Sequence, residues 1–298
     1  MTVQNTKLGM LLMIATVFVF AVQDGFSRYL AGGYSVLMIV MVRYWVFAAF
    51  VMTQAVMTGG GLRKAVRTRH PWLQIARSVL LISEICVMVF AYNRIGLINT
   101  HAIFAVCPLL VAGLAMPILG EKVGWRRWTA IVIGMIGVAI ILQPDGGVFS
   151  LDSLLPLASA FMFALYSLLT RLATRDESAF ISFFWSGIIG CVLMTIVGLP
   201  YLTAMITFDL LMIGVYSFLA LFGHYLLIRS YSMAEASALQ PFAYLQIVFV
   251  TIIAMMVFDE VLHLNVIIGG GIVILAGLFT VIRSRQKNQG KAMRVSQR

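Results

Sequence analysis

Apolar residues follow one another along this chain in long runs that short polar segments separate. A helix needs ~20 mostly apolar residues to cross the hydrocarbon core of a bilayer. Runs near that length cover residues 8–30, 35–57, 72–93, 99–119, 126–142, 153–173, 179–199, 209–230, 237–258 and 264–283. They lack the alternation of a membrane barrel, and isolated strands would leave backbone groups unpaired in lipid. The pattern therefore predicts an all-α integral membrane protein with ten transmembrane helices.

The chain also contains two stretches that resemble each other. The first reads AYNRIGLINTHAIF and continues to LGEKV, and the second reads SYSMAEASALQPFA and continues to FDEVL. An upstream pair is weaker: ATVFVFAVQDGFSRYL from Ala15 matches ASAFMFALYSLLTRLA from Ala158. Aligned pairs include Phe18 with Phe161, Phe20 with Phe163, Arg28 with Arg171, Tyr92 with Tyr231, and Glu121 with Glu260. A duplicated apolar chain is typical of membrane transporters.

The distribution of charge predicts the orientation in the membrane. Of the 298 residues, 61% are hydrophobic, and the formal net charge is +10. The cations occupy alternate loops and the tail. This distribution encodes orientation in a membrane and does not indicate a surface that binds nucleic acid. One side would carry Lys7, Arg63, Lys64, Arg67, Arg69, Lys122, Arg126, Arg127, Arg171, Arg175, Arg229 and those from Arg283 onward, the other only Arg28 and Arg94. We therefore expect both termini in the cytoplasm.

Five spans in each repeat would turn the second repeat upside down relative to the first. The turn after Glu121 carries three cations, whereas the turn after Glu260 carries none, as opposite orientations require. The sequence thus predicts two inverted five-helix repeats, at residues 1–145 and 146–284, followed by a basic cytoplasmic tail at 285–298.

This organisation resembles the EamA type of the drug/metabolite transporter superfamily. The resemblance covers almost the whole chain and includes both acidic turns, LGEKVGWRRWTAIVIGMIGVAIIL and FDEVLHLNVIIGGGIVILAGLF, and the second-span segment RYWVFAAF. Within the superfamily the chain looks most similar to bacterial exporters of amino acids and metabolites. The resemblance implies a secondary transporter in a bacterial inner membrane.

Polar side chains within the spans are the candidates for binding or coupling, because each is costly if it faces lipid unpaired. Glu84 either takes up a proton or a substrate amine, or pairs with Arg77, Arg43 or His224. Arg43 has no acidic residue nearby in its own run and needs a partner from elsewhere. The remaining candidates are His101, His224, Gln240, Tyr166, Trp185 and Tyr244.

Other polar positions are expected to be structural. Asp24 and Arg28 are four residues apart and can form an ion pair on one helix face. Glu121 and Glu260 are expected to accept hydrogen bonds from backbone N–H groups at helix starts. Pro108 lies inside the fourth run, where we expect a kink.

The sequence predicts a transporter that works by alternating access on a small organic solute, with amino-acid or metabolite export as the first choice. A multidrug or cation/proton exchanger is the alternative within this class. A membrane enzyme or a scaffold is the alternative outside it, but no catalytic, ATP-binding or metal-ligand motif occurs. We expect no cofactor and no metal. Monomer and homodimer are both open.

Overall fold

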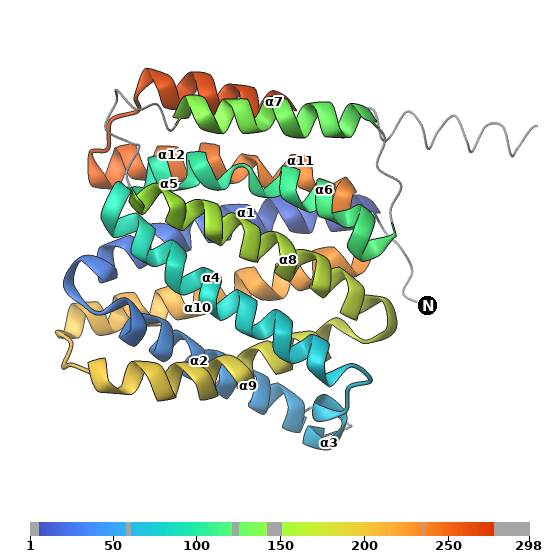
Figure 1. Ribbon diagram of the computed structural model, residues 1–298. Helices are drawn as coiled ribbons and strands as arrows, with labels where there is room; N and C mark the ends of the chain where they lie inside the picture. The colour runs from blue at the N-terminus through green and yellow to red at the C-terminus, as the bar shows by residue number, and fades with distance from the viewer. Residues whose placement is uncertain (1–5, 58–60, 121–124, 142–150, 235, 277–298) are drawn as a thin grey trace, which may run out of the picture.

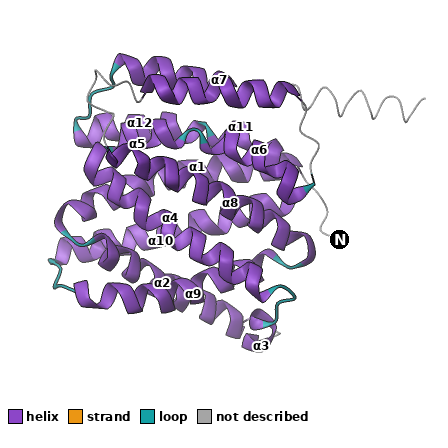
Figure 2. Ribbon diagram, viewed as in Figure 1, coloured by secondary structure: helices purple, strands orange, loops and turns teal. Residues whose placement is uncertain are grey.

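Helices account for nearly all of the described chain (Figures 1 and 2). This computed structural model describes residues 6–57, 61–120, 125–141, 151–234 and 236–276, and no strand occurs among them. The helices are α1 (Thr6–Gly33), α2 (Val36–Met57), α3 (Gly61–Val66), α4 (Pro71–Ile95), α5 (Leu97–Phe104), α6 (Cys107–Leu119), α7 (Trp125–Ile141), α8 (Leu154–Asp176), α9 (Ala179–Gly198), α10 (Thr207–Met233), α11 (Ala236–Ala243), α12 (Leu245–Phe258) and an unlabelled helix over Leu264–Ala276. Short 3-10 turns, η2 (Leu151–Ser153) and η3 (Leu199–Tyr201), precede α8 and follow α9.

The prediction of an all-α membrane protein is confirmed. Seven helices of the described chain are long and apolar enough to cross a membrane, when α5 and α6 are counted together. The fifth, ninth and tenth predicted spans correspond to shorter apolar helices over Val132–Ile141, Leu245–Phe258 and Leu264–Ala276. The number ten therefore stays a prediction.

The fourth and ninth predicted spans are each interrupted near their middle. The first interruption lies between α5 and α6, and Pro108 follows it in the first turn of α6. Proline is tolerated there because the first N–H groups of a helix have no partner within it. The second interruption lies at Tyr244, between α11 and α12. We expected a kink within one fourth helix at Pro108, but this span consists of two helices, α5 and α6.

Helices from the two halves of the sequence alternate in the bundle. α1 packs against α10 and α12, while α4 and α6 pack against α8, and α2 packs against α9. Asn93 near the end of α4 donates to the carbonyl of Ala31 near the end of α1. Gln74 at the start of α4 contacts Glu177 just after α8, so α1 and α8 run in opposite directions (Figure 1). The core is therefore built jointly by both halves.

Matched residues of the two halves make the same contact. The guanidinium of Arg28 donates to the carbonyl of Tyr92 at 3.1 Å. Arg171 donates to the carbonyl of Tyr231 at 3.0 Å. These are the residues that the internal alignment pairs.

The outer surface is apolar and the interior is partly polar. Large apolar side chains such as Val56, Ile196 and Met256 are more than half exposed. Arg43 and Arg77 are almost completely buried. In a water-soluble protein charged residues are almost never fully buried, so this distribution fits lipid as the surrounding solvent.

Candidate substrate site

A cavity with several ionisable side chains in its lining lies between α1, α2, α4, α5, α8, α10 and α12, and we call it the central cavity. Its lining includes Asp24, Arg43, Glu84, Tyr92 and His224. Its volume is about 50 Å³, which is room for a few water molecules. Three of the predicted site residues, distant in sequence, are thus brought to one place by helix packing.

Asp24 is the centre of a hydrogen-bond network in this cavity. Gln23 Nε2 donates to its Oδ1 at 3.1 Å, while Gln246 Nε2 donates to its Oδ2 at 3.2 Å. His101 Nε2 lies 3.1 Å from the same Oδ2, and His101 Nδ1 lies 3.1 Å from the carbonyl of Leu97. A carbonyl can only accept, so Nδ1 carries a proton, and the contact with Asp24 needs another proton on one of its two atoms. A hydrogen bond therefore joins Asp24 of α1 to His101 of α5.

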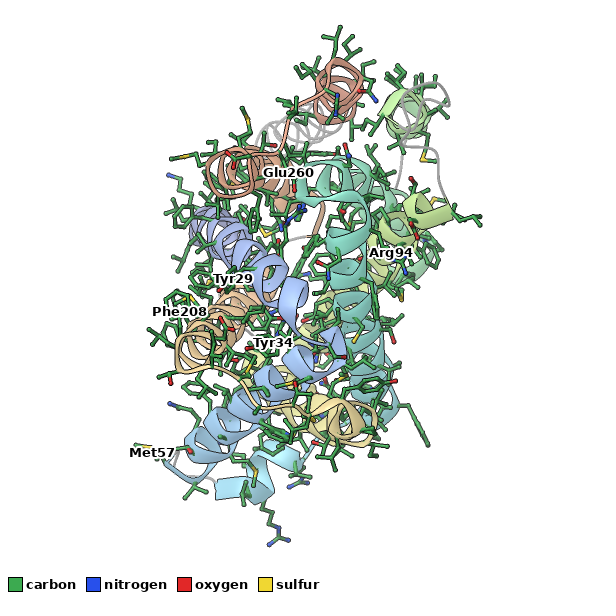
Figure 3. The ribbon with its side chains drawn as sticks, turned by 90° about the vertical axis from the view of Figure 1, so that its left-hand side faces the viewer. Tyr29, Tyr34, Met57, Arg94, Phe208 and Glu260 are labelled. Carbon is green, nitrogen blue, oxygen red and sulfur yellow. The ribbon has the colours of Figure 1, made fainter. Side chains whose placement is uncertain are left out.

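The predicted ion pair between Asp24 and Arg28 does not form. Arg28 lies 2.5 Å from Glu260 instead. Glu260 belongs to the second half of the chain and lies at the end of the bundle that faces the viewer in Figure 3. Both oxygens of Glu260 also accept hydrogen bonds, at 2.9 Å, from the backbone N–H groups of Leu97 and Ile98. Glu260 thus caps α5.

Arg43 reaches the cavity from α2 without a carboxylate partner. Its Nη1 donates to the hydroxyl of Tyr216 at 3.2 Å, and its Nη2 lies 3.3 Å from His224 Nδ1. No carboxylate of the described residues forms an ion pair with Arg43. Its Nε and the Nε2 of His224 are buried without a hydrogen-bond partner. Buried polar atoms without a hydrogen-bond partner are rare in proteins, and these two point to a ligand or water at the site.

Glu84 likewise forms no ion pair with a cation of the described residues. It accepts one hydrogen bond, at 2.9 Å, from Ser159 Oγ. The pairing with Arg77 that the sequence left open is not observed, because Arg77 donates to Thr170 and to the hydroxyl of Tyr166. Glu84 is nevertheless 6% exposed. Its carboxyl group lines the central cavity.

The aromatic predictions fare differently. Trp185 and Tyr166 were expected to line the cavity, but they line neither the central cavity nor a second one beside it. Tyr166 packs on Arg77 instead, with the guanidinium 5.2 Å from its ring centre. Tyr244 lines the second cavity, as does His101. The side chain of Gln240 and all of Glu121 lie outside the described residues.

Sequence reasoning missed several residues of the site. Gln23 and Gln246 complete the network around Asp24, and each is a polar residue inside an apolar run. Phe20 and Phe163 line both cavities. The internal alignment already paired these two phenylalanines, which was a signal that both face the same interior.

The fold and site define an α-helical membrane protein with charged groups around an internal cavity. Residues 7–143 and 152–282 each match the EamA-like transporter family, and the chain belongs to that family. It is a transporter of small solutes and not an enzyme.

Relatives of this chain are named for the solutes that they transport. The chain is 24% identical to an S-adenosylmethionine uptake transporter of Rickettsia prowazekii, over 91% of each chain. It is 27% identical to a riboflavin transporter of Vibrio cholerae, over 91% of this chain and 92% of the relative. A protein of known crystal structure shares the fold with a TM-score of 0.73 and 12% identity, over 94% of this chain and 99% of that one. Neither named relative is an amino-acid exporter, so the predicted substrate class gains no support from them.

Proposed function

We propose that this protein is a secondary transporter for a small organic solute that carries an amino-acid group, with S-adenosylmethionine as the first candidate. The observation that carries the proposal is an acidic and a basic side chain in the lining of one cavity. Glu84 and Arg43 both line the central cavity, and neither forms an ion pair with another described residue. An α-ammonium group fits Glu84, and an α-carboxylate fits the free Nε of Arg43.

The relatives offer two solutes that differ in charge. S-adenosylmethionine carries an amino-acid group and a sulfonium cation. Riboflavin is uncharged and has no group to neutralise Glu84 or Arg43. Burying a charge without a partner is expensive, so the cavity favours the charged solute. Rings of Phe20 and Tyr92 in the same lining suit a sulfonium cation.

Binding requires the helices to move. A cavity of about 50 Å³ is far below the ~300 Å³ of a typical small-molecule site. The solute therefore enters when the bundle opens on one side, and closing around it is the step that alternating access requires.

Transport in proteoliposomes tests the proposal. We expect wild-type protein to take up labelled S-adenosylmethionine, and Glu84→Gln to reach the membrane but lose most of this transport, because glutamine cannot hold the ammonium group by charge. Asp259→Asn removes a carboxylate outside the cavity and should keep wild-type transport.

The same assay also measures transport of solutes from the other substrate classes. Transport of riboflavin or of a lipophilic cation without transport of S-adenosylmethionine would contradict the proposal. Transport of free amino acids alone would support the amino-acid group and remove S-adenosylmethionine. Loading the solute inside or outside the vesicles separates export, which the sequence predicted, from uptake.

A further inference from the structure

A second cavity adjoins the central one on the side where α1 begins. Its volume is about 40 Å³, and its lining is mainly apolar, with Val17 of α1, Pro108 of α6 and Leu227 of α10. Three phenylalanines, Phe20, Phe104 and Phe163, border both cavities, and the Phe104 and Phe163 ring centres lie 5.7 Å apart. We call these residues the phenylalanine partition.

Two hydroxyl groups in the second cavity have no hydrogen-bond partner among the residues that the structure describes. Ser167 Oγ and Tyr244 Oη are buried without a hydrogen bond in the described chain, and both residues line the cavity. Ser167 is 0% exposed and Tyr244 is 4% exposed. A buried hydroxyl without a partner is unfavourable, so two of them around one cavity point to a ligand with hydrogen-bonding atoms.

The internal repeat relates the two cavities. The alignment that pairs Phe20 with Phe163 also places Asp24 opposite Ser167. Asp24 lines the central cavity and Ser167 lines the second one. At equivalent positions one half supplies a carboxylate and the other a neutral hydroxyl. The second cavity therefore suits the uncharged part of a solute.

We propose that the second cavity binds a planar heteroaromatic ring of the transported solute, with Ser167 and Tyr244 hydrogen-bonded to the ring edge and the phenylalanine partition against its faces. This inference rests on the proposed function, in which the central cavity takes the charged end. Aromatic side chains pack well on flat rings, and hydroxyls can donate to or accept from ring nitrogen and oxygen atoms.

The spacing of the cavities agrees with one solute that occupies both. The α1 residues that line the second cavity begin at Met13, and those that line the central cavity end at Asp24. The centres of the two groups are about six residues apart, or ~9 Å at the helical rise of 1.5 Å per residue. An elongated solute with a ring at one end and a charged group at the other fits this arrangement.

Binding measurements on the full-length protein test the ring site. The variants are Ser167→Ala, Tyr244→Phe and the double variant, and the probes are S-adenosylmethionine, riboflavin and methionine. Each variant should weaken S-adenosylmethionine binding about 2- to 10-fold, the loss expected for one hydrogen bond. Methionine has the amino-acid group without a ring, so its affinity should not change. Because the hydroxyls have no partner among the described residues, neither variant should lower the unfolding temperature of the ligand-free protein.

Matched controls come from the same chain. Ser27→Ala and Tyr44→Phe remove hydroxyls that are also buried without a partner but line neither cavity, and they should leave all affinities unchanged.

The outcomes separate the two proposals. Wild-type binding of S-adenosylmethionine with unaltered affinity in the double variant would overturn the ring site and leave the proposed function standing. Riboflavin binding that is weakened in the variants, without S-adenosylmethionine binding, would support the ring site and overturn the amino-acid group. A wild-type protein that binds none of the probes would overturn both.

Discussion

Glu177 shows how one carboxylate holds a turn at an end of the bundle. It accepts hydrogen bonds from Thr68 Oγ1 at 2.6 Å, from Gln74 Nε2 at 2.8 Å and from the backbone N–H of Arg69. Partial burial raises the pKa of Glu177, but these hydrogen bonds outweigh burial and hold the pKa below its usual value of 4.5. The residue joins the segment before α4 to the turn after α8.

This network makes the stability of the protein pH-dependent. A carboxyl whose pKa is lowered by folding stabilises the folded state above its unfolded pKa and loses that contribution as the pH falls through the folded pKa. We expect Glu177→Gln to lower the unfolding temperature at neutral pH by roughly 2–4 °C, for a loss of about 1 kcal/mol.

Thermal unfolding at neutral pH and below pH 4.5 checks this expectation. The difference between wild type and Glu177→Gln should shrink in acid. The control is Asp176→Asn, because the adjacent Asp176 side chain is 60% exposed. A difference that stays constant over the whole pH range would show that the charge of Glu177 does not contribute.

Glu260 acts at the level of an element, since it caps a helix from the other half of the chain. The start of α5 follows Gly96, whose φ of 81° lies in the region that favours glycine. The two N–H groups that follow it point to Glu260, and Arg28 neutralises the carboxylate. An anion at a helix start is favourable because of the free N–H groups and the helix dipole.

We expect Glu260→Gln to lower thermal stability by about 1.5–3 kcal/mol, the range for hydrogen bonds to a charged group. Substrate affinity should change much less, because Glu260 does not line the central cavity. The control Asp259→Asn changes the neighbouring carboxylate and suits its φ of 51°. A variant that keeps wild-type stability but loses affinity would contradict the structural role.

Gly137 and Gly269 allow α7 and the Leu264–Ala276 helix to pack closely. A methyl group on Gly269 would lie 2.5 Å from the carbonyl oxygen of Gly137 in α7, whereas one on Gly270 would meet nothing within 4 Å. These two helices, α7 and the one over Leu264–Ala276, lie next to each other at the top of Figure 1.

Gly269→Ala should therefore lower the unfolding temperature, because backbone cannot easily move aside. Gly270→Ala, one residue away, should leave it unchanged or raise it, since alanine favours a helix over glycine by up to about 1 kcal/mol. Equal effects of the two substitutions would show that α7 and the Leu264–Ala276 helix do not pack in this way.

At the scale of the whole molecule the arrangement of charge predicts topology. The basic segment of α3 and the start of α1 lie at the same end of the bundle (Figure 1). Arg94 and Glu260, labelled in Figure 3, lie at the other end of the bundle, and Arg28 contacts Glu260 there. From the positive-inside rule we therefore expect the α3 end to face the cytoplasm.

Cysteine labelling in intact cells checks this topology. A cysteine at Gly146 should react with an impermeant reagent from outside, and one at Gln289 should react only after the membrane is opened. The background should lack the free residues Cys86, Cys107 and Cys191. Labelling of both positions from the same side would contradict the ten-span prediction.

The sequence by itself determined the class and the general plan of this protein. Runs of apolar residues specify membrane helices because backbone groups in lipid must bond within their own helix, which depends only on local sequence. The repeat and its charge asymmetry are likewise visible in the chain. The position of Glu84, Arg43 and His224 within apolar runs also indicated that these side chains need partners inside the bundle.

Only the tertiary structure decided which partners these residues take. Asp24 and Arg28 share a helix face, yet Asp24 contacts His101 and Arg28 contacts Glu260. Trp185 and Tyr166 lie within apolar spans, but rotation of their helices turns them away from the cavities. A side chain's partner depends on how helices distant in sequence cross one another. A buried charged group pairs with the nearest complementary group on any of these helices. The periodicity of a single helix does not contain that information.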